Sequence, residues 1–560
     1  MTQAERSAQA QNAFSAHPSK DSSSPLRLLE NAFSRLNSRI LLVPALLAVL
    51  AGCGESRLTV DLVNHVQAGE LTAAQTTIDD LYGTDADEAL VRHMEKGLVS
   101  HLQGDFNASD RELDLAAPLV DDLRGSQVGD AIVSSLYNDT VTTYVGKPFE
   151  HTQVDYYRTL NSLLAAGATE GLWVPPTIMV PAREPLLPDP PVDVAKTRDR
   201  AIIVARRMTI NQLKETEDAA GSKRYDDDPF ARVLAACAVL CEAPQRRTES
   251  DQQFTAAMLT RALKAYDAQQ EQLGKNKSFR YEVNGQPTFV KRLYLRHLRT
   301  YDPDLYASES QRLGITDAVP APGTGSVLVL NQVGRIARPQ PLQIGIAAVG
   351  FRSDDSTHFN WGSITFYAKG PGSDIARDWI LLPIPGDVVQ RILAPGGATV
   401  IGFEIPVHEP DAPAPGPAMI RAGDRSAAGE VVCDLDAYAR SRLKDDQPAL
   451  LLKTLLRVAA KQAIVAVGAR AANQKNENSD GGLLGLAINL AGSALATATE
   501  SADLRAWNTL PNLVEATLID LPVGTHPLSI TTTSGSHELG PVCIEAGRLT
   551  LVSVRTMPPR

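Results

Sequence analysis

The spacing of apolar residues divides the chain into a helical part and a part with strands. From residue 58 to about residue 315, apolar residues recur every three or four positions, which is the period of one helix face. After Val319, short runs rich in Val, Ile and Leu predict strands instead. We expect these strands at 326–330, 342–348, 363–368, 379–382, 399–407, 514–519, 526–531 and 549–554. The pattern therefore predicts an α+β fold.

A segment rich in proline and glycine separates the two patterns. Residues 319–325 read Val-Pro-Ala-Pro-Gly-Thr-Gly, a composition typical of a linker. A chain of 560 residues is also too long for one core, because a domain commonly holds about 100–200 residues. We therefore predict a helical domain at 58–318 and a β-rich mixed domain with sandwich-like strands at 326–560.

Two long helices are expected within the second domain. The first lies near 448–472, where Leu, Val and Ala have helical spacing and Pro448 suits a first turn that Asp445 and Asp446 would favour. The second lies near 482–500, a nearly uncharged stretch that is interrupted by glycines, an asparagine and a serine. We interpret this stretch as a packed helix rather than as a membrane span.

The helical domain contains an internal repeat. Gly69 and Gly104 are 35 positions apart, and each is followed by an acidic residue, an apolar residue and then a second apolar helix. A tetratricopeptide repeat has a period of about 34 residues and a small residue at its tight turn. The spacing predicts a tetratricopeptide-like (TPR-like) helical domain with these two glycines at the repeat turns.

A third helical unit and an insertion follow the two repeats. The segment Tyr144-Val-Gly-Lys-Pro-Phe-Glu150 predicts a helix, a turn and a new helix, with Gly146 in the turn and Pro148 near the helix start. Residues 167–196 contain too many prolines for a helix interior, so we expect an insertion there.

The amino-terminal region has the form of an export signal. An apolar stretch of about 12 residues follows Arg39, which is the length of a signal-peptide core and too short to cross a bilayer. It ends in Leu50-Ala51-Gly52-Cys53, which resembles the bacterial lipobox, in which the cysteine receives diacylglycerol and becomes the new amino terminus.

Three expectations follow from this resemblance. Residues 1–52 form a signal peptide with a long polar leader and are removed, which leaves 53–57 as the lipidated end of the mature chain. The protein is held to a membrane through its diacylglyceryl-cysteine. An aspartate directly after the cysteine favours the inner membrane in lipoproteins of two-membrane bacteria, and this chain has Gly54 there. We therefore expect the outer membrane, facing the periplasm.

Several motifs together resemble an uncharacterised family of bacterial tetratricopeptide-like lipoproteins. Besides the lipobox and the segment 144–150, they are Tyr156-Tyr157, Ala205-Arg-Arg207, Gly325-Ser-Val-Leu-Val-Leu330 and Ala502-Asp-Leu-Arg-Ala-Trp-Asn-Thr-Leu-Pro511. The resemblance brings no assigned activity. Members are often encoded beside lipoproteins that resemble activators of penicillin-binding proteins, which implies work near cell-wall assembly.

Charge and cysteine content exclude some classes of partner and leave others open. A net charge of −11 argues against nucleic acid, because binding to phosphates needs clustered Lys and Arg. Cys237 and Cys241 stand four apart in an apolar run and are interpreted as buried small residues, with a metal or redox pair as the alternative. Cys433 and Cys543 could form a disulfide in an oxidising compartment.

Two segments hold candidate catalytic groups. Asp503, Arg505 and Trp507 offer either a polar site beside an aromatic platform or an Asp–Arg pair that fixes the turn into Pro511, and we favour the structural interpretation. The other segment contains Asp354, Asp355 and His358, which we interpret as a solvated loop. Nucleophile elbows, phosphate-binding loops and metal-ligand spacings are absent from the sequence, so no catalytic residue, metal or cofactor is predicted.

Two hypotheses of function follow. The favoured one is a membrane-anchored envelope lipoprotein that acts as a protein-binding scaffold through its helical repeats, with a role in cell-wall assembly and no enzymatic activity. The alternative is an envelope hydrolase or transferase that acts on glycan or peptide near Asp503 or Asp354. A concave pocket that gathers those groups would favour the enzyme, and their burial in helix contacts would favour the scaffold.

Overall fold

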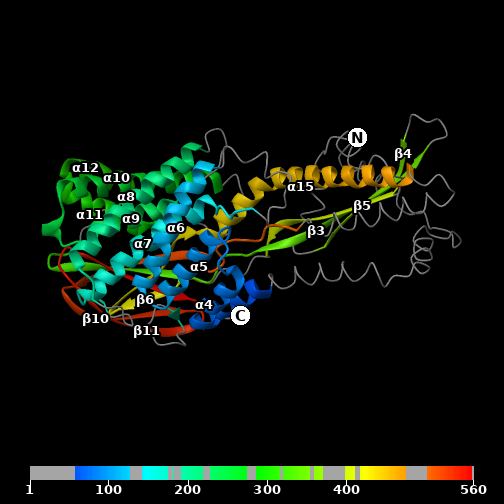
Figure 1. Cartoon of the computed structure of the whole chain (residues 1–560). Coiled ribbons are helices and arrows are strands. Elements are labelled where there is room, and N and C mark those ends of the chain that lie inside the picture. Colours follow the sequence, from blue (N-terminus) through cyan, green and yellow to red (C-terminus); the bar gives the residue numbers. More distant parts are fainter. Residues whose placement is uncertain are drawn as a thin grey trace, which may run out of the picture. The chain divides into compact units, whose positions relative to one another are not determined.

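The computed structural model contains helices and sheets, so the expected α+β fold is confirmed (Figure 1). The described residues belong to one compact unit. No helix among the described residues is long and apolar enough to cross a membrane. The structure describes residues 57–126, 142–173, 179–180, 191–218, 228–273, 285–315, 320–352, 359–369, 398–409, 416–474 and 501–557.

Successive helices pack side by side in the helical part (Figure 1). The described residues begin with a helix at 57–68, and the next helix is α4. From α4 onward, each helix contacts the one that follows it. The helices are α4 (Leu71–Tyr82), α5 (Ala89–Leu102), α6 (Phe106–Ser126), α7 (Pro148–Thr169), α8 (Val194–Asp218), α9 (Pro229–Leu240), α10 (Glu249–Leu273), α11 (Thr288–Tyr301) and α12 (Pro303–Leu313), with the short 3-10 helix η2 (Pro244–Arg246) before α10.

Gly69 and Gly104, the glycines of the predicted repeat, both lie in left-handed turns between helices. Gly69, with φ of 74°, separates the helix at 57–68 from α4, and Gly104, with φ of 79°, separates α5 from α6. Glycine suits both positions because side chains with a Cβ rarely adopt positive φ. After the second turn, Asp105 caps α6 by accepting the backbone N–H of Ala108 at 2.7 Å.

The strands among the described residues form three sheets. The five-stranded sheet has the order β1 (Met179–Val180), β12 (Leu549–Thr556), β2 (Thr324–Val333), β9 (Leu513–Pro522) and β8 (Glu430–Asp434). The four-stranded sheet has the order β11 (Gly535–Ile544), β10 (Gly524–Thr532), β6 (Met419–Ala422) and β7 (Arg425–Ala428). The three-stranded sheet has the order β4 (Phe359–Lys369), β3 (Pro339–Arg352) and β5 (Ala398–His408).

The five-stranded sheet is the middle layer between helices and the four-stranded sheet. Alternate residues of β2 face opposite layers: the Gln332 amide accepts a hydrogen bond from Tyr157 of α7 at 2.8 Å, whereas Asn331 donates to Glu515 of β9 at 2.8 Å. Glu515 in turn accepts the backbone N–H of Ala418, which directly precedes β6. Burial on both faces explains why β2 is a continuous apolar run in the sequence.

The helices share one hydrophobic core with the five-stranded and four-stranded sheets. We predicted a linker at 319–325, but Thr324 already begins β2, which pairs with both β9 and β12. The proline-rich insertion at 167–196 contributes β1, which pairs with β12, and the buried Trp173, whose backbone pairs with Val542. These contacts place residues on both sides of the predicted linker in a single compact unit.

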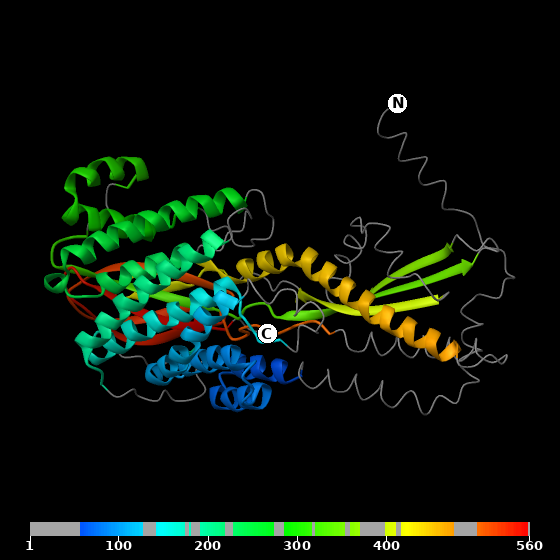
Figure 2. The ribbon, with the colours of Figure 1, turned by 45° about the horizontal axis from the view of Figure 1, so that its top comes forward.

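The long helix of the second part begins earlier than predicted. It is α15 (Leu435–Gln474), and the Asp434 side chain accepts the N–H of Ala437 at 2.9 Å near its start, so Pro448 lies inside the helix rather than in its first turn. It contacts β5, and the two run side by side in Figure 2. The strands β6, β7, β8 and β11 were not predicted. The predicted strand at 379–382 and helix at 482–500 lie outside the described residues.

The cysteines of the compact unit are free thiols. Cys433 on β8 and Cys543 on β11 are not joined, which corrects the possible disulfide between them. Cys237 and Cys241 on α9 are buried among apolar side chains of the core, as their spacing indicated. Burial raises the pKa of Cys241 to about 11, so this thiol stays protonated at neutral pH.

Candidate functional site

Two motifs that lie about 350 positions apart in the sequence meet through the Glu150 carboxylate. One oxygen of Glu150 accepts the Tyr144 hydroxyl at 2.7 Å and the backbone N–H of Lys147 at 2.6 Å. The other oxygen accepts the backbone N–H of Trp507 at 2.9 Å. Glu150 therefore caps the start of α7 and holds the segment 501–512 against it.

The turn before α7 requires glycine at position 146. Gly146 has φ of +72°, and a Cβ there would lie 2.9 Å from Nε2 of His151. The same imidazole nitrogen contacts the Val145 carbonyl at 2.8 Å, so the ring cannot move away without losing that bond. The turn positions Tyr144 and Lys147 beside Glu150.

Arg505 joins three parts of the chain. Its Nε and Nη2 bond the two carboxylate oxygens of Asp503 at 2.9 and 2.8 Å, and its Nη1 bonds Glu88 at 3.0 Å and the Thr142 carbonyl at 2.8 Å. The guanidinium also lies 5.5 Å from the centre of the Tyr144 ring, a cation–π distance. Burial by itself would lower the pKa of Arg505, but the hydrogen bonds and negative charges of Asp503 and Glu88 have the larger effect. The pKa therefore lies above its ordinary value, and the guanidinium is always charged.

Trp507 lies in the core rather than on the surface. Its side chain is fully buried, and its ring centre is 5.9 Å from that of Tyr157. The platform interpretation needs an exposed ring, so the geometry favours the structural interpretation of this tryptophan. The turn that follows leads through Leu510 and Pro511 into β9.

A second buried carboxylate, on Glu95 of α5, holds the next two residues of the same segment. It accepts the backbone N–H of Asn508 at 2.7 Å and that of Thr509 at 3.2 Å, and also the Thr509 hydroxyl. Burial raises the pKa of Glu95 to about 7, against the opposing effect of these donors. Sequence reasoning missed Glu95, although a glutamate on the apolar face of an amphipathic helix was a usable signal.

A chain of buried polar groups continues from there into the sheet. Arg555 of β12 donates to the Thr509 carbonyl at 2.9 Å, and Gln332 bonds Nε2 of His101 at 3.3 Å. Nδ1 of His101 lies 2.7 Å from the Asn161 amide oxygen, so the neutral ring carries its proton on Nδ1. Burial lowers the pKa of His101 to about 4, which keeps the ring neutral.

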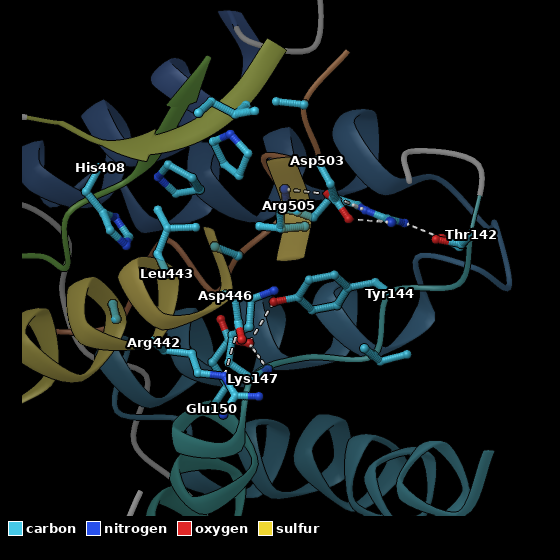
Figure 3. Close-up of a pocket in the computed structure, with 18 of the residues that line it drawn as sticks. Thr142, Tyr144, Lys147, Glu150, His408, Arg442, Leu443, Asp446, Asp503 and Arg505 are labelled. Carbon is cyan, nitrogen blue, oxygen red and sulfur yellow. Dashed lines mark hydrogen bonds and ion pairs between the residues drawn. The ribbon is translucent and has the colours of Figure 1, made fainter. Parts of the chain in front are cut away.

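A cavity of about 1080 Å³ lies beside these motifs (Figure 3). Its walls are α15, the end of β5, the segment 142–150 and the segment 501–507. Figure 3 shows His408 of β5, Arg442 of α15 and Asp503 on different sides of it. Charged groups of both signs line it, among them Lys147, Arg442, Asp446, Lys453, Arg457, Glu404, Asp503 and Arg505.

Two pairs of charged groups at this cavity bond each other. Arg442 pairs with Asp446 at 3.0 Å, and Asp503 pairs with Arg505. Burial lowers the pKa of His408 to about 4, so this ring is neutral at the cavity wall. Carboxylates that accept two or three hydrogen bonds are weaker general bases, because these bonds stabilise the charged form.

The structure brings together only some of the predicted site residues. One group lies at the junction, by which we mean the contact between the segments 142–150 and 501–507: Tyr144, Gly146, Pro148, Glu150, Asp503, Arg505 and Trp507. Gly69 and Gly104 lie elsewhere, at turns between helices. The lipobox Leu50, Ala51, Gly52 and Cys53 lies outside the described residues, as do Asp354, Asp355 and His358. Within the described ranges, no group of three or more His, Cys, Asp or Glu side chains is arranged to hold a metal ion.

Comparisons with protein-family models, with curated proteins and with solved structures found no match. The resemblance to tetratricopeptide-like lipoproteins therefore stays a prediction.

Proposed function

We propose that this chain is an exported lipoprotein, anchored through diacylglycerol on Cys53 after removal of residues 1–52. The observation that carries the proposal is the lipobox Leu50-Ala51-Gly52-Cys53 behind an apolar stretch. The described residues begin with a helix at 57–68, four positions after the cysteine, which is consistent with an anchor close to the folded part. Gly54 in place of aspartate supports the outer membrane, with the protein facing the periplasm.

The anchored part holds a protein partner near the cell-wall assembly machinery. The TPR-like spacing of the helix pairs and the family resemblance support this role. The faces of α7 and α9 contact strands of this same chain, so they are not free for a partner. A partner therefore binds another face of the protein.

An envelope hydrolase or transferase is the second candidate, because Asp503 and Arg505 line a cavity. Both oxygens of Asp503 accept hydrogen bonds from Arg505, and both oxygens of Glu150 accept bonds from the backbone. These groups hold the chain together at the junction, so the scaffold is the better-supported function.

The test replaces Cys53 with serine. In the proposed account, Cys53→Ser abolishes incorporation of labelled palmitate and moves the protein from the membrane to the soluble fraction. Cys237→Ser is the matched control and keeps both properties, although its buried position calls for a folding check. Mild crosslinking and affinity purification of the native protein then recover envelope proteins in a stable ratio. Unchanged lipidation of Cys53→Ser would overturn the anchor, and a bait without specific partners would overturn the scaffold.

A further inference from the structure

Helix α8 presents a row of apolar side chains to solvent. One side of the helix packs against α7 and α9, whereas on the other side Ile203, Ile210 and Leu213 are 67%, 54% and 37% exposed. Single exposed apolar residues are ordinary on a protein surface, but several that gather on one face indicate a binding surface. We call this row, together with the charged residues that continue it at both ends, the α8 stripe.

A further exposed apolar side chain stands on α6, beside the α8 stripe. Arg200 of α8 bonds Asp114 of α6 at 3.0 Å, and the next residue of α6, Leu115, is 54% exposed. A second arginine of α8, Arg207, bonds Asp121 of α6 at 3.1 Å. The two helices are therefore joined over two turns, and both present apolar side chains to solvent.

We infer that the α8 stripe binds the same stripe of a second copy of this chain, with the two helices antiparallel about a twofold axis. Its residues are arranged symmetrically about the midpoint between positions 206 and 207. Ile203 and Ile210 stand at equal distances on either side of this midpoint, and so do Asp199 and Lys214. In a twofold interface, residue i of one copy contacts residue j of the other, and j contacts i. Ile203 therefore meets Ile210 of the second copy, and Asp199 meets its Lys214.

These four side chains share one face of the helix. At about 100° per residue, each lies within about 30° of the direction that bisects the stripe. All four are exposed. Within the part of the chain that the structure describes, neither Asp199 nor Lys214 has an ion pair of its own. A second copy supplies the opposite charge to both, and each pair then occurs twice in the interface.

The two arginines nearest the axis do not oppose this pairing. Arg206 pairs with Asp251 of α10 at 3.0 Å and lies 5.1 Å from the centre of the Phe254 ring. Arg207 pairs with Asp121 of α6, on the other side of the helix. Each guanidinium is thus drawn to one side of the stripe, and its charge is neutralised within its own chain.

The charge pattern favours a second copy over a membrane surface. Anionic lipids attract helices whose polar residues are Lys and Arg, but Asp199 continues the apolar row at one end and would be repelled. A helix of 25 residues offers less surface than large obligate interfaces bury, so we expect a reversible dimer. The inference does not rest on the lipid anchor or on the scaffold function.

The first experiment measures sedimentation equilibrium of the full chain in a density-matched mild detergent. Ile203→Asp places a charge in the apolar row, and Asp199→Lys places a lysine opposite Lys214 of the second copy. The exchange variant Asp199→Lys/Lys214→Asp restores both pairs with their charges reversed. Leu305→Asp at an exposed position of α12 and Asp80→Lys at an exposed position of α4 are the matched controls. Urea unfolding midpoints check that each variant folds.

We expect the native chain to form a dimer as its concentration rises. The dissociation constant of this dimer rises at least tenfold in Ile203→Asp and at least threefold in Asp199→Lys. It returns to within twofold of the native value in the exchange variant, and both controls stay within twofold. A native chain that remains monomeric overturns the inference, as do controls that weaken the dimer as much as the stripe variants. An exchange variant that remains as weak as Asp199→Lys overturns the antiparallel pairing.

The second experiment tests the register by disulfide crosslinking of the double variant Ile203→Cys/Ile210→Cys. Cys543, a partly exposed native thiol, is replaced by serine in every sample. Within one chain the two new thiols are about 10 Å apart along the helix and cannot join each other. We expect covalent dimers whose crosslinked peptides, identified by mass spectrometry, join position 203 to position 210, and far fewer dimers from either single variant. Crosslinks that join 203 to 203 as often as 203 to 210 would contradict the antiparallel dimer.

Discussion

Glu95 of α5 accepts the backbone N–H of Asn508 at 2.7 Å, although the two residues are 413 positions apart in the sequence. The carboxylate is fully buried and also accepts the N–H and the hydroxyl of Thr509. This contact joins the first helices of the chain to the segment that leads into β9. Together with Glu150 on Trp507, it fixes one wall of the cavity.

Replacing Glu95 with alanine should strongly destabilise the fold. The change leaves two backbone N–H groups and a hydroxyl without their acceptor in a buried site, and each unsatisfied group costs about 1–3 kcal/mol. We expect Glu95→Ala to lower the free energy of unfolding by at least about 3 kcal/mol in urea titrations. The exposed Asp80→Ala on α4 is the control and should change it by less than about 0.5 kcal/mol. Equal small effects for both would show that the contact contributes nothing.

The stability of the native protein should depend on pH through Glu95. Its pKa is about 7 in the folded state and about 4.5 when unfolded, so between these values the folded state binds more protons. The free energy of unfolding contributed by this group therefore falls as the pH rises from 4.5 to 7. At about 1.4 kcal/mol per pKa unit, the difference is on the order of 3 kcal/mol.

The glutamine variant isolates this contribution. Relative to Glu95→Gln, the native protein should gain stability as the pH is lowered from 7 to 4.5, as measured by urea unfolding at each pH. The comparison cancels the opposite effect of His101, whose lowered pKa reduces stability as the pH falls through 6.5 toward 4. Parallel curves for the native protein and Glu95→Gln would mean that Glu95 does not titrate in this window.

Replacing Arg505 with lysine should destabilise the fold. The arginine bonds Asp503 through two nitrogens and reaches Glu88 and the Thr142 carbonyl with a third. A lysine ammonium cannot match this planar geometry, so both carboxylates lose part of their pairing. We expect Arg505→Lys to cost about 2–4 kcal/mol of unfolding free energy. Arg111→Lys, at an exposed position of α6, is the control and should leave the free energy of unfolding nearly unchanged. An equally small change in Arg505→Lys would show that the planar guanidinium is not needed at this position.

Alanine at position 146 should cost more than alanine at position 171. Both glycines have φ of +72°, so both substitutions strain the backbone by about 1–3 kcal/mol. At Gly146 the new Cβ would also lie 2.9 Å from His151, whereas at Gly171 no atom is within 4 Å. The urea midpoint of Gly146→Ala should therefore be clearly below that of Gly171→Ala. A reversed order would contradict the close packing of the turn before α7.

Periodic patterns in the sequence predicted local elements well. Apolar residues at helical spacing indicated the helices, and the strands β2, β3, β4, β5, β9, β10 and β12 overlap predicted apolar runs. Gly69 and Gly104 were placed correctly at turns, because a backbone position with positive φ usually requires glycine, and glycine is visible in the sequence. The strands β6, β7 and β8 were missed because they have only 4, 4 and 5 residues, and β11 was missed because it opens with Gly-Ser-His-Glu, which contains no apolar side chain. The start of α15 was predicted too late because Pro448 suits a first turn, whereas Asp434 caps the helix earlier.

Long-range pairing could not be predicted in the same way. The motifs at 144–150 and 503–511 were both visible, but nothing in their spacing indicated that Glu150 bonds Trp507. The predicted linker at 319–325 was misleading, because a strand that begins there is buried by helices from one side and by a sheet from the other. The cavity also depends on α15 meeting β5, a contact that only the fold creates.

The lipid anchor is tested most directly by mass spectrometry of the amino-terminal peptide of the protein purified from membranes. The account predicts that the chain begins at Cys53, with diacylglycerol on its sulfur, and that no peptide from residues 1–52 remains. A chain that retains those residues, with an unmodified thiol on Cys53, would contradict it.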